Sequence, residues 1–207
     1  MIYLRKPSSQ QLERVLDSSR EADFNYPFTG VTRDLLVDGE GPKGFRLDRF
    51  TFRLGSGDEA FEAAREAIDS WQMFNHSMAS LHPMDSNTSL QTCVTVLFGG
   101  YGLWILNPAR ILYRLSESNL RDGHVKQYGF AYGTLPGHIA KGEECFSVEM
   151  DTITKEVQFR ITVISRPGHF LSWIGGMIMT REQKRFRRLA GRAMKSYVDL
   201  KLGIEPG

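Results

Sequence analysis

The sequence predicts an α+β fold in which a curved antiparallel sheet packs against a long C-terminal helix. Strand-like segments follow one another through residues 92–163 with no helical pattern between them. The final stretch of the chain instead repeats apolar residues at helical spacing. An early strand and helix precede this series, and that order is typical of α+β folds rather than of alternating, doubly wound folds.

In the first half, Ser8 and Gln11 form a capping-box pattern, which predicts an amphipathic helix over 8–19. Residues 24–30 are rich in aromatics and turn formers, so we expect irregular structure there. Residues 45–54 read as a strand whose apolar positions require a bulge or a register change near Asp48. Asp58 is then expected to cap a helix over 59–71.

In the second half, strands are predicted over 92–98 and 109–116, joined by the apolar segment 99–108, and over 126–133. The clearest hairpin pairs 146–150 with 157–163, with one face of each strand buried and the other facing water. A helix is expected from Thr180, with Ala190, Met194 and Leu200 on its apolar face.

The complete order of elements indicates a helix-grip, or START-like, architecture within a single domain, 1–207. A bent sheet does not close fully against one helix, and the gap between them is a common place for an apolar ligand. The fold therefore predicts a pocket but no particular chemistry.

Composition fits a globular chain of 207 residues, because the hydrophobic fraction is 41% and the charged fraction 24%. The net charge of +2 favours no nucleic-acid partner. Cys93 and Cys145 are the only cysteines, and the chain starts without a signal-peptide pattern, so a reducing, cytoplasmic location is expected. The apolar stretches 94–106 and 170–179 are too short or too broken to span a bilayer as helices.

Two histidine-containing blocks are the least ordinary part of the sequence. The first is GTLPGH (133–138), followed by GEE (142–144), and the second is SRPGHFLSW (165–173), which precedes a basic helix. Together with the N-terminal RKPS and FNYPFTGVT segments and the helix that ends in Trp71, these blocks resemble the DUF1990 family of uncharacterised proteins found in bacteria and plants. The resemblance covers nearly the whole chain and implies no established reaction.

Because the two blocks end neighbouring predicted strands, we expect their polar side chains to meet at one rim of the sheet. Such a rim suits acid–base or metal-assisted chemistry, since histidines and carboxylates share protons and bind metals. The structural alternative is a shaped turn in which His138 bonds to backbone and Glu143 or Glu144 pairs with Arg166. No HExxH or CxxC spacing is present, so neither a metal nor another cofactor is expected.

Three functions remain open from sequence. The first is binding of a small apolar or amphipathic ligand, with candidate ligand-binding residues Tyr128, Tyr132, Thr134, His138, Glu143, Glu144, Arg166 and His169. The second is an enzyme that uses the same His/Glu rim, with catalytic residues unassigned. The third is contact with a membrane or partner through Arg185, Arg187 and Arg188, for which the structural alternative is a solvated helix face. The oligomeric state is left open.

Overall fold

The computed structural model describes residues 1–35, 39–84, 86–100, 102–120, 123–168 and 176–205, and places the side chains of all of these except 117–120 and 176–183. The helices are α1 (Ser9–Arg20), α2 (Val31–Asp34), α3 (Asp58–Asp69) and α5 (Gly176–Lys201), with a 3-10 turn, η1 (Gln72–Phe74). The strands are β1 (Ile2–Tyr3), β2 (Arg46–Ser56), β3 (Ala79–His82), β4 (Cys93–Gly100), β5 (Leu103–Leu120), β6 (Val125–Thr134), β7 (Ala140–Asp151) and β8 (Glu156–Pro167).

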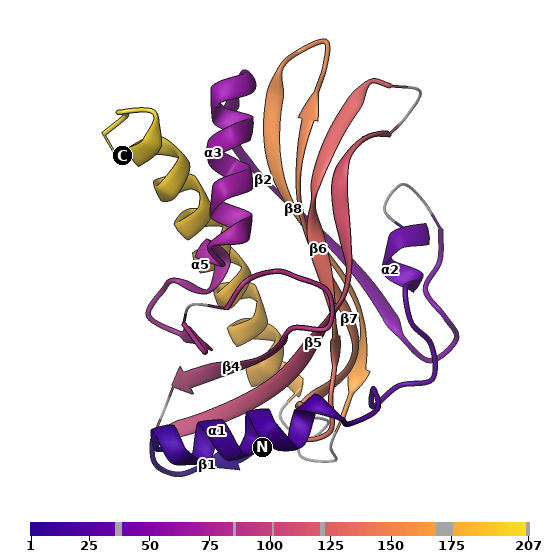
Figure 1. Ribbon diagram of the computed structural model, residues 1–207, viewed down its shortest axis with the longest axis vertical. Coiled ribbons are helices and arrows are strands. Elements are labelled where there is room, and N and C mark those ends of the chain that lie inside the picture. The colour runs from indigo at the N-terminus through magenta and orange to yellow at the C-terminus, as the bar shows by residue number, and fades with distance from the viewer. Residues whose placement is uncertain (36–38, 85, 101, 121–122, 169–175, 206–207) are drawn as a thin grey trace.

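Eight strands form one antiparallel sheet in the described part of the chain, in the order β2-β8-β7-β6-β5-β4-β3, with β1 paired to β5. The sheet bends around α3 and α5, which lie on its concave side, while α2 lies on the convex side (Figure 1). Register shifts within β2 and β5 accompany this bend, as β-bulges do. The predicted helix-grip architecture is therefore confirmed, and β2 is an edge strand.

Helix α1 begins as the sequence predicts. The Ser8 hydroxyl accepts a hydrogen bond from the Gln11 amide, and the Gln11 side chain accepts one from the Ser8 amide. At α3 the prediction was wrong by one residue: Gly57 is the N-cap and Asp58 is the first helical residue. The helix also ends at Asp69, because Trp71 adopts φ 55°, outside the helical region.

The predicted bulge or register change near Asp48 is wrong. Asp48 pairs regularly with Val163, and the register shift lies instead between Arg53 and Gly55. The apolar pattern changes phase because Phe45 packs against Phe28 outside the sheet interior, with ring centroids 4.7 Å apart, whereas Phe50 and Phe52 pack against the core on the concave side. Two sets of apolar residues on opposite faces need no bulge between them.

The segment 99–108 does not join two separate strands as predicted. It belongs to a hairpin in which β4 continues to Gly100 and β5 starts at Leu103, directly opposite. Gly102, at φ +73°, supplies the left-handed conformation that this tight connection needs. Helix α5 likewise starts at Gly176, before the predicted Thr180.

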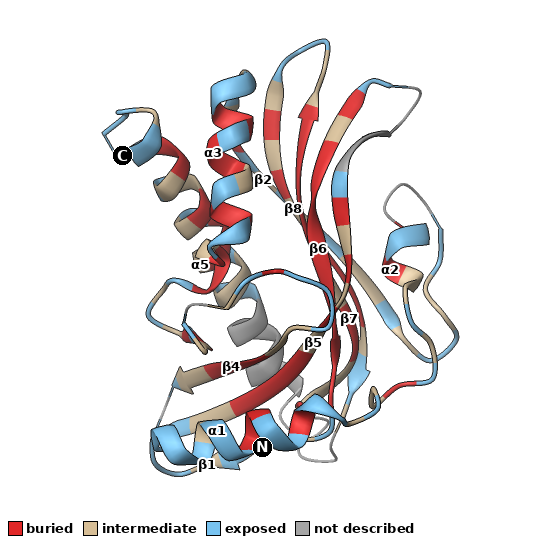
Figure 2. Ribbon diagram, viewed as in Figure 1, coloured by how far each residue is buried: buried red, intermediate tan, exposed pale blue. Residues whose placement is uncertain are grey.

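The core lies between the concave face of the sheet and helices α3 and α5 (Figure 2). Phe146 is at its centre, with ring centroids 5.6 Å from Phe74, 5.7 Å from Phe130 and 6.4 Å from Phe159. All four rings are at most 2% exposed. The space between the sheet and α3 is therefore filled by packed aromatic side chains.

The convex face of the β7–β8 hairpin is also covered, so its prediction as a wet face is wrong. Cys145, Ser147 and Thr162 are at most 1% exposed on that face. Helix α2 packs against β7 and β8 there. On α5, Ala190 and Met194 are buried as predicted, whereas Leu200 is 74% exposed, because Val198 occupies the inward position at the C-terminal end.

Candidate functional site

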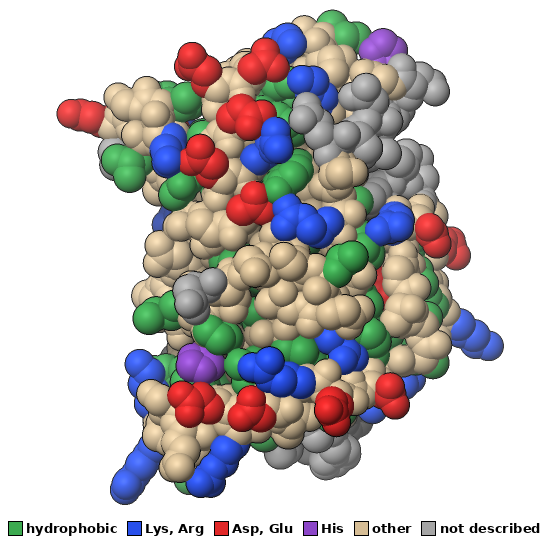
Figure 3. All heavy atoms as spheres, in the orientation of Figure 1, with side chains coloured by type: hydrophobic (Ala, Val, Ile, Leu, Met, Phe, Trp, Pro, Cys, Tyr) green, Lys and Arg blue, Asp and Glu red, His purple; other side chains and the backbone are tan. Residues whose placement is uncertain are grey.

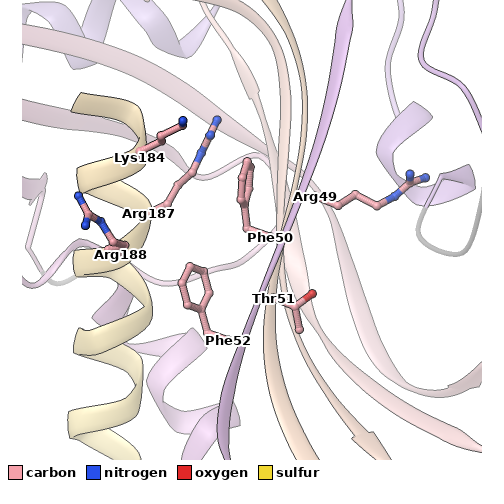
Figure 4. A pocket seen from close by; sticks show the side chains of 7 residues that line it. All are labelled: Arg49, Phe50, Thr51, Phe52, Lys184, Arg187 and Arg188. Carbon is pink, nitrogen blue, oxygen red and sulfur yellow. The ribbon is translucent and has the colours of Figure 1, made fainter. Parts of the chain in front are cut away.

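An open groove between edge strand β2 and helix α5 forms the candidate site. Its volume of about 560 Å³ lies within the roughly 300–1,000 Å³ typical of small-molecule pockets. Phe50 and Phe52 point from β2 toward α5 (Figure 4). The described lining residues are Arg49, Phe50, Thr51, Phe52, Lys184, Arg187 and Arg188.

The pleat of β2 determines which of its residues face α5. Successive side chains of a strand point to opposite faces, so Phe50 and Phe52 face α5 while Arg49 and Thr51 project to the other side (Figure 4). Arg49 is held there by a 2.9 Å hydrogen bond from its guanidinium to the carbonyl oxygen of Leu35. The apolar floor of the groove therefore comes from alternate residues of a single strand.

Arg187 links the groove to the interior of the protein. Its guanidinium carbon lies 3.8 Å from the centroid of the Phe50 ring, and Nη2 lies 3.6 Å from Oδ2 of Asp48. Only 13% of its side chain is exposed. Burial lowers the pKa of Arg187, while the carboxylates of Asp48 and Glu144 oppose that effect. The group remains a cation because the ordinary pKa of arginine is so high.

The helical spacing of Arg187, Gly191 and Met194 places all three on the face of α5 that meets the sheet. Gly191 allows close approach, because a Cβ atom there would lie 2.5 Å from Cδ1 of Phe52. Met194 is fully buried one turn further along. This close contact fixes the distance between α5 and β2, and so the width of the groove.

Buried Tyr132 and half-buried Glu144 form a polar pair on the concave face, and Arg187 acts electrostatically on it. They are direct neighbours across β6 and β7, and the Tyr132 hydroxyl donates a hydrogen bond to Oε2 of Glu144. Burial raises the pKa of the Glu144 carboxyl, against the opposing effects of the Tyr132 hydrogen bond and the Arg187 charge. Burial, together with Glu144, also raises the pKa of Tyr132 well above its ordinary value.

Glu143 lies on the opposite face of the sheet, because adjacent strand residues alternate in direction. Its carboxylate accepts hydrogen bonds from the Gly30 amide at 2.6 Å, the Thr32 amide at 3.0 Å and the Thr32 hydroxyl at 2.8 Å. The Tyr26 hydroxyl donates a fourth, at 3.4 Å. Glu143 therefore anchors the FNYPFTGVT segment to the sheet, and it shares no site with Glu144.

The described parts of the two histidine-containing blocks lie at one edge of the sheet. Ala140 pairs with Pro167, and the Gly168 amide donates to the Ile139 carbonyl at 2.8 Å. His138 is buried in this turn, where its Nδ1 accepts a hydrogen bond from the Ala140 amide at 3.0 Å. Burial lowers the pKa of His138 to about 3, so the ring is neutral. His169 lies outside the described residues.

The other predicted site residues lie apart from the groove. The Thr134 hydroxyl accepts from the Gly142 amide at 2.9 Å and so braces the turn. The Tyr128 hydroxyl donates to Asp69 at 2.7 Å, near the C-terminal end of α3. Arg166 lies over the ring of Phe45, 4.8 Å from its centroid, so the predicted pairing of Arg166 with Glu143 or Glu144 is wrong. The pairing does not form because Glu143 accepts a hydrogen bond from the Gly30 amide and Glu144 accepts one from the Tyr132 hydroxyl.

The sequence analysis missed the groove residues Phe50 and Phe52 and the inward direction of Arg187. Arg187 was grouped with Arg185 and Arg188 as one basic face, yet those two residues are exposed while Arg187 faces β2. The spacing of three and four residues from Arg187 to Ala190 and Gly191 was the signal that could have revealed its direction. Nothing in the sequence signalled that β2 would be an edge strand.

Charges of both signs are interspersed over α1 and α3 on the face shown in Figure 3. Within the described residues, no helix is both long enough and apolar enough to cross a membrane. The same residues include no cluster of three or more His, Cys, Asp or Glu side chains arranged to hold a metal ion.

Comparison with solved structures finds chains of similar fold. The crystal structure of Ara h 8.0201 matches with a TM-score of 0.45 at 12% identity, over 75% of this chain and 98% of that one. Norcoclaurine synthase from Thalictrum flavum, in complex with dopamine and hydroxybenzaldehyde, matches with a TM-score of 0.44 at 8% identity, over 87% and 96%.

Sequence relatives are closer. A UPF0548 protein of Arabidopsis thaliana is 30% identical over 209 residues, covering 96% of this chain and 99% of the relative. A UPF0548 protein of Deinococcus radiodurans is 31% identical over 207 residues, covering 93% and 98%. The family model described as a domain of unknown function, DUF1990, matches residues 25–193. The chain therefore belongs to the DUF1990 family, as its two histidine-containing blocks predicted.

Proposed function

We propose that the protein binds a small apolar or amphipathic ligand in the groove between β2 and α5. The observation that carries this proposal is a hollow of about 560 Å³ beside two aromatic rings, Phe50 and Phe52, that pack against the core but remain partly exposed. A ligand that covers these rings removes apolar surface from water, which favours binding.

The groove supports this function better than the centre of the protein does. Phe74, Phe146 and Phe159 fill the described space beside α3, whereas Phe50 and Phe52 are partly exposed where they pack against the core. The polar end of the ligand site is then Arg187 with the pair Tyr132 and Glu144, which are two of the ligand-binding residues predicted from the sequence.

The contacts of His138 and Glu143, two residues of the predicted His/Glu rim, favour a structural role over acid–base catalysis. His138 Nδ1 accepts from the Ala140 backbone, and Glu143 is held by four hydrogen-bond donors on the convex face. A general base needs a lone pair within reach of a substrate proton. Neither residue, as described, presents one to the groove.

One of the three arginines predicted to contact a membrane or partner faces the sheet instead. Arg187 faces β2 with 13% of its side chain exposed, so only Arg185 and Arg188 of the three predicted arginines are exposed. Two exposed cations give a weaker attraction to an anionic surface than three, at about 1 kcal/mol each.

Binding can be tested with the neutral fluorescent probe N-phenyl-1-naphthylamine. We expect the wild-type protein to bind it, and Phe50→Ala and Phe52→Ala to lower the affinity roughly tenfold, as expected for losing part of a buried ring. Phe28→Ala is the matched control, since it removes a half-buried ring that packs against Phe45 outside the groove. Absence of probe binding, or equal affinity in all four proteins, would contradict the proposal.

A further inference from the structure

We infer that the ligand of this groove is an anionic amphiphile, in which Arg187 holds a carboxylate, sulfate or phosphate head group while Phe50 and Phe52 contact the apolar body. This inference rests on the proposed binding function and adds the class of ligand. It follows from the charge of the lining residues, the other partners of the nearby carboxylates, and the burial of Arg187.

The lining of the groove carries charge of one sign. Among its seven described residues, four are Arg or Lys and none is acidic. Arg49 points to the far side of β2 and donates to the Leu35 carbonyl, which leaves Lys184, Arg187 and Arg188 on the α5 side. Of these three, Lys184 and Arg187 extend toward the side of Phe50, whereas Arg188 extends away from it (Figure 4). Cations beside an apolar floor attract a ligand that has a negative end and an apolar remainder.

Arg187 shares its nearby carboxylates with other hydrogen-bond donors. Asp48 lies 3.6 Å from it, but the same oxygen of Asp48 is 2.6 Å from Nη2 of Arg46 and accepts a 2.7 Å hydrogen bond from Nε of that residue. Glu144 is hydrogen-bonded to Tyr132, and burial raises its pKa, which disfavours its charged form. Arg187 is therefore a largely desolvated cation whose acidic neighbours already have other partners.

Arginine at this position is suited to recognise an anionic head group. A guanidinium presents several N–H donors in a planar fork that matches carboxylate and phosphate oxygens. The Phe50 ring, 3.8 Å from the guanidinium carbon, restricts where the fork can lie. Because the side chain is already largely out of water, a bound anion gains more from the interaction than it would on an exposed arginine.

The test compares two probes with the same apolar chain, dodecanoate and dodecanol, as competitors of N-phenyl-1-naphthylamine at low salt. We expect dodecanoate to bind the wild-type protein roughly tenfold more tightly than dodecanol, the scale of one charge-assisted interaction. Arg187→Met is expected to abolish that preference while keeping dodecanol binding. Arg192→Met is the matched control, since Arg192 is exposed on the same helix and does not line the groove.

A second measurement does not depend on the folding of the variant. In wild-type protein, raising the salt concentration to about 0.5 M should reduce the preference for dodecanoate, because salt screens charge interactions. Millimolar inorganic phosphate should fail to displace dodecanoate, because it has no apolar body. Vesicles containing phosphatidylserine should bind the protein no better than phosphatidylcholine vesicles, because the head group is bound inside the groove.

The outcomes distinguish a failure of the anionic ligand class from a failure of the proposed binding function. Equal displacement by dodecanol and dodecanoate overturns the anionic class and leaves the proposed function standing. Failure of both to displace a bound probe overturns the proposed function itself. Full displacement by inorganic phosphate, or capture by phosphatidylserine vesicles without dodecanoate binding, also overturns the inference, in favour of a simple anion site or a lipid surface.

Discussion

The buried turn residue His138 makes the stability of this protein depend on pH in a predictable direction. Its imidazole is buried beside Ala140, and burial lowers its pKa from 6.5 to about 3. Because the folded-state pKa is depressed, the unfolded chain takes up a proton first as the pH falls. The contribution of the neutral ring to the free energy of unfolding is fully present above pH 6.5 and is lost progressively as the pH falls toward 3.

The magnitude follows from these two pKa values. Proton linkage with 6.5 in the unfolded state and about 3 in the folded state removes ~2 kcal/mol of unfolding free energy between about pH 7.5 and about pH 5. The substitution His138→Asn should abolish most of this loss. An asparagine side chain can still accept the hydrogen bond from the amide two residues later, as in an Asx-turn, but it does not titrate.

The assay is urea unfolding of the wild-type protein and the His138→Asn variant at both pH values. His124→Asn is the control, because His124 is exposed and lies in a different turn. We expect the control to lose as much stability on acidification as the wild type, and His138→Asn to lose ~2 kcal/mol less. If His138→Asn and the wild type lose the same free energy, the reasoning from burial is refuted.

Three further substitutions test other parts of the structure. Glu143→Gln should lower the unfolding free energy by about 2–4 kcal/mol in urea titration. The NH2 group of glutamine would face N–H and O–H donors whose hydrogen bonds the carboxylate accepts. Glu144→Gln should gain stability relative to wild type as the pH rises from about 4 to about 8, measured by the same titration. The direction of this change follows from the raised pKa of Glu144 in the folded state, because the wild type loses stability as that carboxyl ionises. Gly191→Ala should lower the melting temperature although alanine favours helix, because its Cβ would meet the Phe52 ring at 2.5 Å.

Each of these has a result that contradicts it. Glu13→Gln, on the exposed face of α1, is the control for Glu143→Gln, and an equal effect of the two would remove the anchoring role of Glu143. A Glu144→Gln variant whose stability runs parallel to wild type across the pH range would show that the carboxyl is not perturbed. A Gly191→Ala variant that melts higher than wild type would show that α5 has room to move away from β2.

Several features of this protein were determined by local sequence. The capping box of Ser8 and Gln11, the alternation through 146–163 and the apolar stripe of α5 depend on neighbours within a few residues. Such patterns fix the type of each element, and the order of the elements then restricts the fold to a sheet holding a terminal helix. The placement of the GTLPGH and SRPG segments at one edge of the sheet also followed from this order.

The tertiary structure alone decided which side chains meet. Glu143 and Glu144 are adjacent in sequence, yet the first is held by Gly30 and Thr32 on the convex face and the second by Tyr132 on the concave face. Arg187 reaches Phe50 only because α5 crosses the edge strand, over a separation of 137 residues that no local pattern encodes. Side-chain direction depends on strand phase and on long-range packing, and therefore the site appears only when the distant segments are assembled.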